Sequence, residues 1–183
     1  MNNDELSVLA DPMFEQYFLI SREKLTLLFE AAGIRPDDTV LEVGAGAGTV
    51  ARNMPPCKSL TVAELDTRLI DTLRRQVPHA TVVQGDALRL VKELPYDVLI
   101  GNLPNVVTEE LVDVLPELTF RTAVLAAGQH TDFDRLRDTF DITEVTTITG
   151  SDFAPPQPSV SRIVRLVRRN AGCSGRRMRE RNS

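Results

Sequence analysis

A glycine-rich turn after an apolar segment is the first feature that can do chemistry. Residues 39–43 read as a buried strand, and the turn that follows has GxGxG spacing, with glycines at Gly44, Gly46 and Gly48. Glycine permits a tight turn and lets the backbone approach a ligand closely. A dinucleotide fingerprint, GxGxxG, would need glycine at position 49, where Thr49 stands. The turn therefore predicts either a structural element or the site of a ligand other than a dinucleotide.

The acidic residue before this turn indicates which ligand fits. Glu42 would repel a pyrophosphate, but its carboxylate can accept hydrogen bonds from an ammonium, directly or through water. A cofactor with an amino-acid end and no phosphates has these properties. The residues therefore favour S-adenosylmethionine.

Two more carboxylates follow the next expected strands. Glu64 comes after residues 60–63, twenty positions beyond Gly44, where a carboxylate can hold both ribose hydroxyls. Asp86 comes after residues 81–83 and can accept a hydrogen bond from an adenine amino group. Each carboxylate alone is more often a helix cap or a solvated loop residue. Together they favour cofactor binding, because ligands of open α/β sheets bind at the carboxyl ends of the strands.

A fourth segment can hold the group that reacts. Asn102-Leu103-Pro104-Asn105 ends the strand expected over residues 96–100. The side-chain oxygen of Asn102 and the carbonyl of Leu103 can both accept hydrogen bonds from an exocyclic amine. This arrangement would point the nitrogen lone pair at an electrophilic methyl group, so the chemistry would need positioning rather than a strong base. The alternative is a loop in which Pro104 ends the strand.

These segments need an alternating α/β framework to bring them together. Apolar runs alternate with amphipathic stretches, which is typical of βα units and a parallel sheet. The pattern predicts helices over 21–33, 67–76, 108–116 and 132–139, and strands over 39–43, 60–63, 81–83, 96–100, 123–126, 142–148 and 161–167. The order indicates a nucleotide-binding α/β half followed by a pair of strands.

Composition and charge limit the class of protein. The 183 residues are 42% hydrophobic, with no apolar run long enough for a membrane span, and the acidic N-terminus lacks the apolar region of a signal peptide. Two distant cysteines suit a reducing cytoplasm, and no His or Cys spacing indicates a metal. The net charge is −5: residues 168–183 carry +5 and the remainder −10. An acidic body matches a phosphate backbone poorly.

Five segments in order resemble the family of rRNA adenine N6-dimethyltransferases. They are Gln16-Tyr17-Phe18-Leu19, the stretch from Glu42 to Gly48, Ala63-Glu64-Leu65-Asp66 with Gly85-Asp86-Ala87, Asn102-Leu103-Pro104, and Phe153-Ala154-Pro155-Pro156 with Val160 to Leu166. The match covers residues 14–167. The resemblance implies a Rossmann-like class I methyltransferase fold, with seven strands of which one is antiparallel. It also implies S-adenosylmethionine as cofactor and transfer of methyl groups to an adenine N6.

The resemblance assigns roles to individual residues. It implies a cofactor site formed by Gln16, Tyr17, Leu19, Glu42, Gly44, Gly46, Gly48, Glu64, Leu65, Asp86, Ala87 and Asn102. It implies an acceptor site formed by Asn102, Leu103, Pro104, Asn105 and Phe153. Phe153 is expected to stack on a planar substrate or to lie in the core. A methyltransferase domain is expected over residues 1–167, with an N-terminal helical element over 14–35, and an Arg-rich disordered tail over 168–183.

Three departures from the family pattern leave the substrate open. Asn105 replaces the aromatic residue after Asn-Leu-Pro, the family's small helical C-terminal domain has no counterpart in residues 168–183, and the body is acidic. The candidate substrates are therefore an RNA adenine and a small-molecule or peptide amine. A non-catalytic binding module of the same fold is a third alternative. No pattern in the sequence indicates an oligomeric state.

Overall fold

The computed structural model describes residues 1–169. In this part of the chain the α-helices are α1 (Asn3–Leu9), α2 (Arg22–Ala32), α3 (Thr67–Gln76), α4 (Ala87–Glu93) and α5 (Asn105–Val114). The strands are β1 (Phe18–Leu19), β2 (Thr39–Val43), β3 (Ser59–Glu64), β4 (Thr81–Gln84), β5 (Val98–Asn102), β6 (Thr122–Gly128), β7 (Phe140–Ile148), β8 (Phe153–Ala154) and β9 (Ser161–Arg168). Short 3-10 turns are η1 (Pro12–Phe14), η2 (Ala51–Asn53), η3 (Leu115–Glu117), η4 (Asp134–Leu136) and η5 (Gly150–Asp152).

Seven strands form the central sheet in the order β4-β3-β2-β5-β6-β9-β7. β9 runs antiparallel to both of its neighbours, β6 and β7, and the other pairs are parallel. The predicted Rossmann-like sheet with one antiparallel strand is therefore confirmed. The chain also forms a two-stranded antiparallel sheet from β1 and β8, which the sequence did not indicate.

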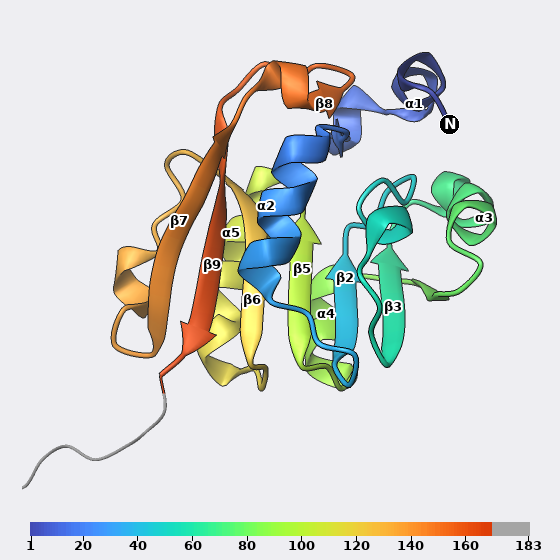
Figure 1. Cartoon of the computed structure of the whole chain (residues 1–183). Coiled ribbons are helices and arrows are strands. Elements are labelled where there is room, and N and C mark those ends of the chain that lie inside the picture. Colours follow the sequence, from blue (N-terminus) through green and yellow to red (C-terminus); the bar gives the residue numbers. More distant parts are fainter. Residues whose placement is uncertain (170–183) are drawn as a thin grey trace, which may run out of the picture.

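Helices cover both faces of the sheet (Figure 1). Leu25 and Leu28 of α2 pack with Leu73 of α3 on one face, and Leu111 and Val112 of α5 pack on the other. Burial on both sides explains why the central strands read as continuous apolar runs rather than as alternating ones.

Local capping chemistry explains why two helices lie where they were expected. Ser21 accepts a hydrogen bond from the amide of Lys24 at the start of α2, and Gly33 ends that helix with a φ of 53°. Asp66 accepts from the amide of Arg68 at the start of α3. These are the standard N-cap and C-cap residues, and both helix predictions are confirmed.

The helix predicted over 132–139 is wrong. This segment contains a single 3-10 turn, η4, in which Phe133 and Leu136 are buried. The backbone amides of Leu136 and Arg137 donate to the carbonyls of Phe133 and Asp134, three positions back, which closes 3-10 turns rather than an α-helix. The helix predicted over 108–116 begins earlier, at Asn105, because α5 starts directly after Pro104.

The predicted start of the tail, at residue 168, is also wrong. Arg168 belongs to β9, and its guanidinium lies over the rings of Phe120 and Phe140 and donates hydrogen bonds to the carbonyls of Leu115, Pro116 and Leu118. The next residue, Arg169, bonds Asp141. The sheet therefore extends to Arg168, Arg169 follows it, and the rest of the predicted tail lies outside the described residues.

Chain order places a crevice beside β2. From β2 the chain moves through β3 to β4 on one side, and it then crosses to β5 and β6 on the other. Ligands of such sheets bind at this switch point, outside the carboxyl ends of the strands. Within residues 1–169, no helix has both the length and the apolar character needed to cross a membrane.

Candidate functional site

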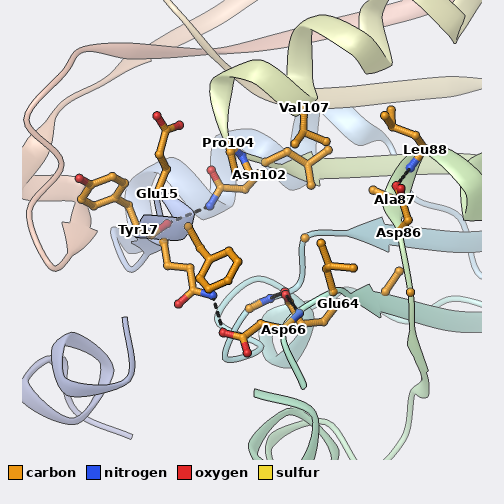
Figure 2. A pocket seen from close by; sticks show the side chains of 18 of the residues that line it. Glu15, Tyr17, Glu64, Asp66, Asp86, Ala87, Leu88, Asn102, Pro104 and Val107 are labelled. Carbon is orange, nitrogen blue, oxygen red and sulfur yellow. Dashed lines mark hydrogen bonds between the residues drawn. The ribbon is translucent and has the colours of Figure 1, made fainter. Parts of the chain in front are cut away.

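A cavity of about 240 Å³ opens at the carboxyl ends of β2, β3, β4 and β5. Figure 2 shows its lining, with Glu64 and Asp66 at one end, Asp86 beside the start of α4, and Asn102 below Pro104. The predicted residues that line it are Gln16, Tyr17, Gly44, Gly46, Glu64, Leu65, Asp86, Ala87, Asn102, Leu103 and Pro104. The structure thus brings together most of the residues that the sequence indicated, from five segments of the chain.

The cavity is strongly acidic. Its lining carries five carboxylates, those of Glu15, Glu64, Asp66, Asp86 and Glu110, and none of the described lining residues is Lys, Arg or His. A pyrophosphate would be repelled here, whereas a ligand with an ammonium, a sulfonium and several N–H or O–H donors would be attracted. The donor and acceptor chemistry therefore fits S-adenosylmethionine better than a dinucleotide.

Glu64 connects two loops at the edge of the cavity. Its Oε2 accepts from the amide of Gly46 at 2.7 Å, and its Oε1 accepts from the amide of Asp66 at 2.8 Å. Burial raises the pKa of Glu64, and these hydrogen bonds oppose that rise. Each carboxylate oxygen can accept a further hydrogen bond, so Glu64 can hold ribose hydroxyls while fixing the glycine turn.

Asp66 is a site residue whose role the sequence did not reveal. Its carboxylate accepts hydrogen bonds from Arg68 and from Nε2 of Gln16, at 2.9 Å in the latter case. The hydrogen bonds from Arg68 are the main reason why its pKa falls to about 2. Asp66 therefore stays ionised and anchors the segment that contains Gln16 to the loop after β3.

The adenine end is built by the start of α4. Asp86 caps this helix by accepting from the amide of Leu88 at 2.7 Å, which leaves its second oxygen free for a ligand. Leu88 and Val107 add apolar side chains to the lining. An apolar slot with one carboxylate at its rim suits an adenine ring with an amino group.

Asn102 is oriented by a neighbouring backbone carbonyl. Its Nδ2 donates to the carbonyl of Tyr17 at 3.1 Å, and the side-chain oxygen makes no hydrogen bond within the described chain. That oxygen can therefore accept from an amine. The carbonyl of Leu103 accepts from the hydroxyl of Thr108 at 3.3 Å and has a second lone pair available.

Asn105 lines a second, smaller cavity of about 100 Å³ that shares Asn102 and Tyr17 with the first. Its side chain lies over Gly128 at the end of β6, where a Cβ atom would be 2.7 Å from Oδ1 of Asn105. The shared position of Asn102 makes this second cavity the candidate acceptor pocket.

Four predicted site residues line neither the cofactor cavity nor the acceptor pocket. Phe153 and Leu19 pair across the β1–β8 sheet, 3% and 0% exposed, so Phe153 is a core residue and the expected stacking role is corrected. Gly48 has a φ of 82° and faces α3, and a side chain there would meet Leu73 at 3.1 Å. Leu19 and Gly48 thus support the site from behind. The fourth is Glu42.

Glu42 lies in the sheet rather than in the cavity lining. It is 2% exposed, its neighbours on β3 and β5 are Val62 and Ile100, and its Oε2 has no hydrogen-bond partner in the described chain. Burial, together with the charge of Glu64, raises the pKa of Glu42 to about 8. Burial disfavours the charged form of Glu42, whereas a nearby ammonium would favour it, so the expected contact with the cofactor stays a prediction.

This buried acid predicts a pH-dependent stability. The folded chain keeps the proton at a pH where the unfolded chain has lost it, so stability should fall from about pH 4.5 to about pH 8. One pKa unit corresponds to about 1.4 kcal/mol, which moves Tm by about 3–6 °C in a chain of this size. Glu42→Gln should flatten this decrease in thermal melts between pH 5 and 9. The exposed Glu30→Gln serves as control, and an equal slope in both variants would contradict the assignment.

Sequence reasoning missed several lining residues, namely Phe14, Glu15, Leu88, Val107 and Glu110. The spacing of Val107 and Glu110, three residues apart at the start of α5, was the one usable indication, because such residues share a helix face. Phe14 lies under the guanidinium of Arg68 at 5.4 Å, a contact that no local pattern reveals.

Comparison with known proteins agrees with this geometry. The family model described as "Ribosomal RNA adenine dimethylase" matches residues 9–178. A mitochondrial ribosomal RNA small subunit methyltransferase of Arabidopsis thaliana is 28% identical over 83% of this chain and 46% of its own length. A probable ribosomal RNA small subunit methyltransferase A of Methanosarcina acetivorans is 29% identical over 85% of this chain and 65% of its own length. The chain thus spans about half to two thirds of these relatives.

Solved structures show the same fold. A dimethyladenosine transferase from Plasmodium falciparum superposes with a TM-score of 0.74 at 25% identity, covering 83% of this chain and 63% of that one. The 23S rRNA methyltransferase ErmE gives the same TM-score at 28% identity, covering 84% and 70% of the two chains. With a family model that spans most of the sequence, the chain belongs to the ribosomal RNA adenine dimethylase family.

Proposed function

We propose that this chain is an S-adenosylmethionine-dependent N-methyltransferase that acts on the N6 amine of an adenine in RNA. The observation that carries the proposal is the position of Asn102, whose free side-chain oxygen lies where the acidic cavity and the acceptor pocket meet. The names of the relatives and of the matched structures, which refer to ribosomal RNA and to dimethyladenosine, support the choice of substrate.

The side chains of this protein would bind and orient the reactants. The cofactor supplies an electrophilic methyl group on a sulfonium. Glu64 would hold its ribose hydroxyls and Asp86 its adenine amino group. Asn102 and the carbonyl of Leu103 would accept both N–H groups of the target amine, so that its lone pair faces the methyl carbon. As the new N–C bond forms, the C–S bond breaks, and the nitrogen then loses a proton to solvent. Pro104 stiffens the loop, so these acceptors are held in place before binding.

The experiment is transfer of radiolabelled methyl groups from S-adenosylmethionine to RNA with unpaired adenines. We expect label in N6-methylated adenosine after digestion of the RNA to nucleosides. Single-stranded DNA of the same sequence and a panel of small amines and lysine peptides are the comparison acceptors. Label in an amine or peptide but never in RNA would contradict the proposal, as would transfer to no acceptor at all.

A small-molecule or peptide amine is the second candidate acceptor. The observations that favour it are the charge of −10 on residues 1–167 and the lack of an aromatic ring at Asn105. Binding of a polyanion would weaken steeply with salt, whereas binding of a small amine would not.

For location we propose the cytoplasm, in keeping with the free thiol of Cys57.

Restoring an aromatic residue tests the acceptor directly. If the acceptor is an unstacked adenine, Asn105→Tyr should lower the KM for RNA by about tenfold, since stacking of one base contributes about 1–3 kcal/mol. If the pocket is shaped for another molecule, the ring should block it and raise KM. Steady-state kinetics measures both, and Asn105→Leu, which adds bulk without a ring for stacking, is the matched control.

A further inference from the structure

Glu15 has an unusual backbone conformation beside the acceptor pocket. Within residues 1–169 it is the one non-glycine residue with positive φ, at 49°. Residues other than glycine, asparagine and aspartate rarely adopt this left-handed region, and its strain persists only where the surroundings hold the residue in place. The carboxylate itself is exposed. The strained backbone thus presents a charged side chain to solvent rather than to the core.

A contact far along the chain holds this side chain in place. Oε2 of Glu15 accepts from the backbone amide of Asn105 at 3.1 Å, across 90 positions. Asn105 is the first residue of α5, and the N-cap of that helix, Pro104, offers no side-chain hydrogen bond. A carboxylate at this position satisfies a free amide and interacts favourably with the helix dipole. Glu15 is therefore fixed against the loop that would hold the reacting amine.

The acceptor pocket has no other charge. Its described lining consists of Glu15 and uncharged residues, namely Tyr17, Asn102, Leu103, Pro104, Asn105, Ala126, Ala127, Gln157, Pro158, Ser159 and Ser161. The adjoining surface hollow shares Asn105 and Ser159 and adds a second carboxylate, Glu109, and one imidazole, His130, with no Lys or Arg in its described lining. A phosphate placed beside Glu15 would meet the negative charge of this side chain, with no Lys or Arg in the described lining of the pocket to compensate it.

We propose that Glu15 is a specificity-determining residue that selects against acceptors with a phosphate at the pocket opening. The inference rests on the proposed function and deepens it, because it says which part of a nucleotide can approach this side. The N6 amine of an adenine faces Asn102 and the carbonyl of Leu103, and the phosphates of its own nucleotide point away from Glu15. A nucleoside, which has no phosphate, therefore binds more tightly beside Glu15 than a monophosphate whose phosphate lies at the opening.

The test compares adenosine with adenosine 5′-monophosphate and adenosine 3′-monophosphate. Kd values are measured by ligand-observed NMR titration, which reaches millimolar affinities, with S-adenosylhomocysteine saturating the cofactor cavity. Glu15→Gln removes the charge and keeps an oxygen that can accept from Asn105. Glu15→Gly removes the side chain, and glycine adopts a positive φ without strain. This variant should therefore be at least as stable as the native chain. Glu30→Gln is the control, since it makes the same charge change at an exposed position of α2 that lines neither cavity nor the adjoining hollow.

Both Glu15 variants should bind at least one monophosphate about threefold to tenfold more tightly relative to adenosine, as expected for a nearby charge screened by water. Glu30→Gln should leave this ratio unchanged. If adenosine binds and is methylated but the ratio of monophosphate to adenosine Kd is the same in every variant, the role proposed for Glu15 is wrong and the proposed function stands. If no adenine compound binds while a small amine is methylated, the proposed function fails and this inference fails with it.

Discussion

Asn102→Ala is expected to lower the rate constant of methyl transfer about a hundredfold, with little change in cofactor affinity. The amide oxygen is the acceptor that would hold the target amine, and loss of one preorganised group of this kind costs about 10²–10³ in rate. The amide nitrogen donates to the carbonyl of Tyr17, so the alanine variant also loses a link between the segment before β1 and the end of β5. The measurement is single-turnover transfer from saturating cofactor.

A conservative variant separates chemistry from structure. Asn102→Asp keeps an acceptor oxygen but places a carboxylate against the carbonyl of Tyr17, so it should be at least as slow as the alanine variant. Thr108→Val is the matched control: it removes the hydroxyl that donates to the carbonyl of Leu103 and should leave the rate within about threefold, because that carbonyl then has more capacity to accept. A single-turnover rate for Asn102→Ala close to that of the native chain would refute the role of Asn102.

Features that depend on near neighbours could be predicted from the sequence. Ser21 and Gly33 bound α2 because capping is decided within one turn. The glycine turn and the carboxylates of Glu64 and Asp86 follow strands whose carboxyl ends meet by topology. Knowing the strand order was therefore sufficient to place these groups around one cavity.

Contacts that join distant segments could not be predicted. The segment from residue 14 to residue 18 lines the cavity because of three hydrogen bonds: Gln16 to Asp66, Asn102 to the carbonyl of Tyr17, and the amide of Asn105 to Glu15. The two partners in each bond lie 50 to 90 positions apart, and no periodicity links them. The role of Glu15 was invisible for this reason.

Two misplaced side chains show where strand patterns mislead. Glu42 precedes the glycine turn, but it belongs to a strand that is covered on both faces, and this coverage buries every residue of β2 after Thr39. Phe153 stands in a motif associated with the acceptor, yet its strand pairs with β1 and points the ring into the core. Nearness to a motif in sequence did not decide which way either side chain points.

Glu64→Ala is expected to weaken cofactor binding about tenfold to a hundredfold. The loss of a charge-assisted hydrogen bond to the ribose should cost about 1.5–3 kcal/mol. The structure adds a second effect, because Glu64 also accepts from the amides of Gly46 and Asp66. The alanine variant leaves both amides without this partner, so the free chain should melt at a lower temperature, since an unsatisfied buried donor costs about 1–3 kcal/mol.

Calorimetric titration of S-adenosylhomocysteine, together with melts of the free chain, separates these two effects. Glu110→Gln is the matched control, because it removes one negative charge from the same cavity without touching the glycine turn. It should change Kd by less than about threefold, which measures what the general charge of the cavity contributes. If Glu64→Ala lowers Tm but leaves Kd equal to that of Glu110→Gln, then Glu64 serves the turn alone. A tenfold or larger gap in Kd between the two variants is what a direct hydrogen bond to the ribose requires.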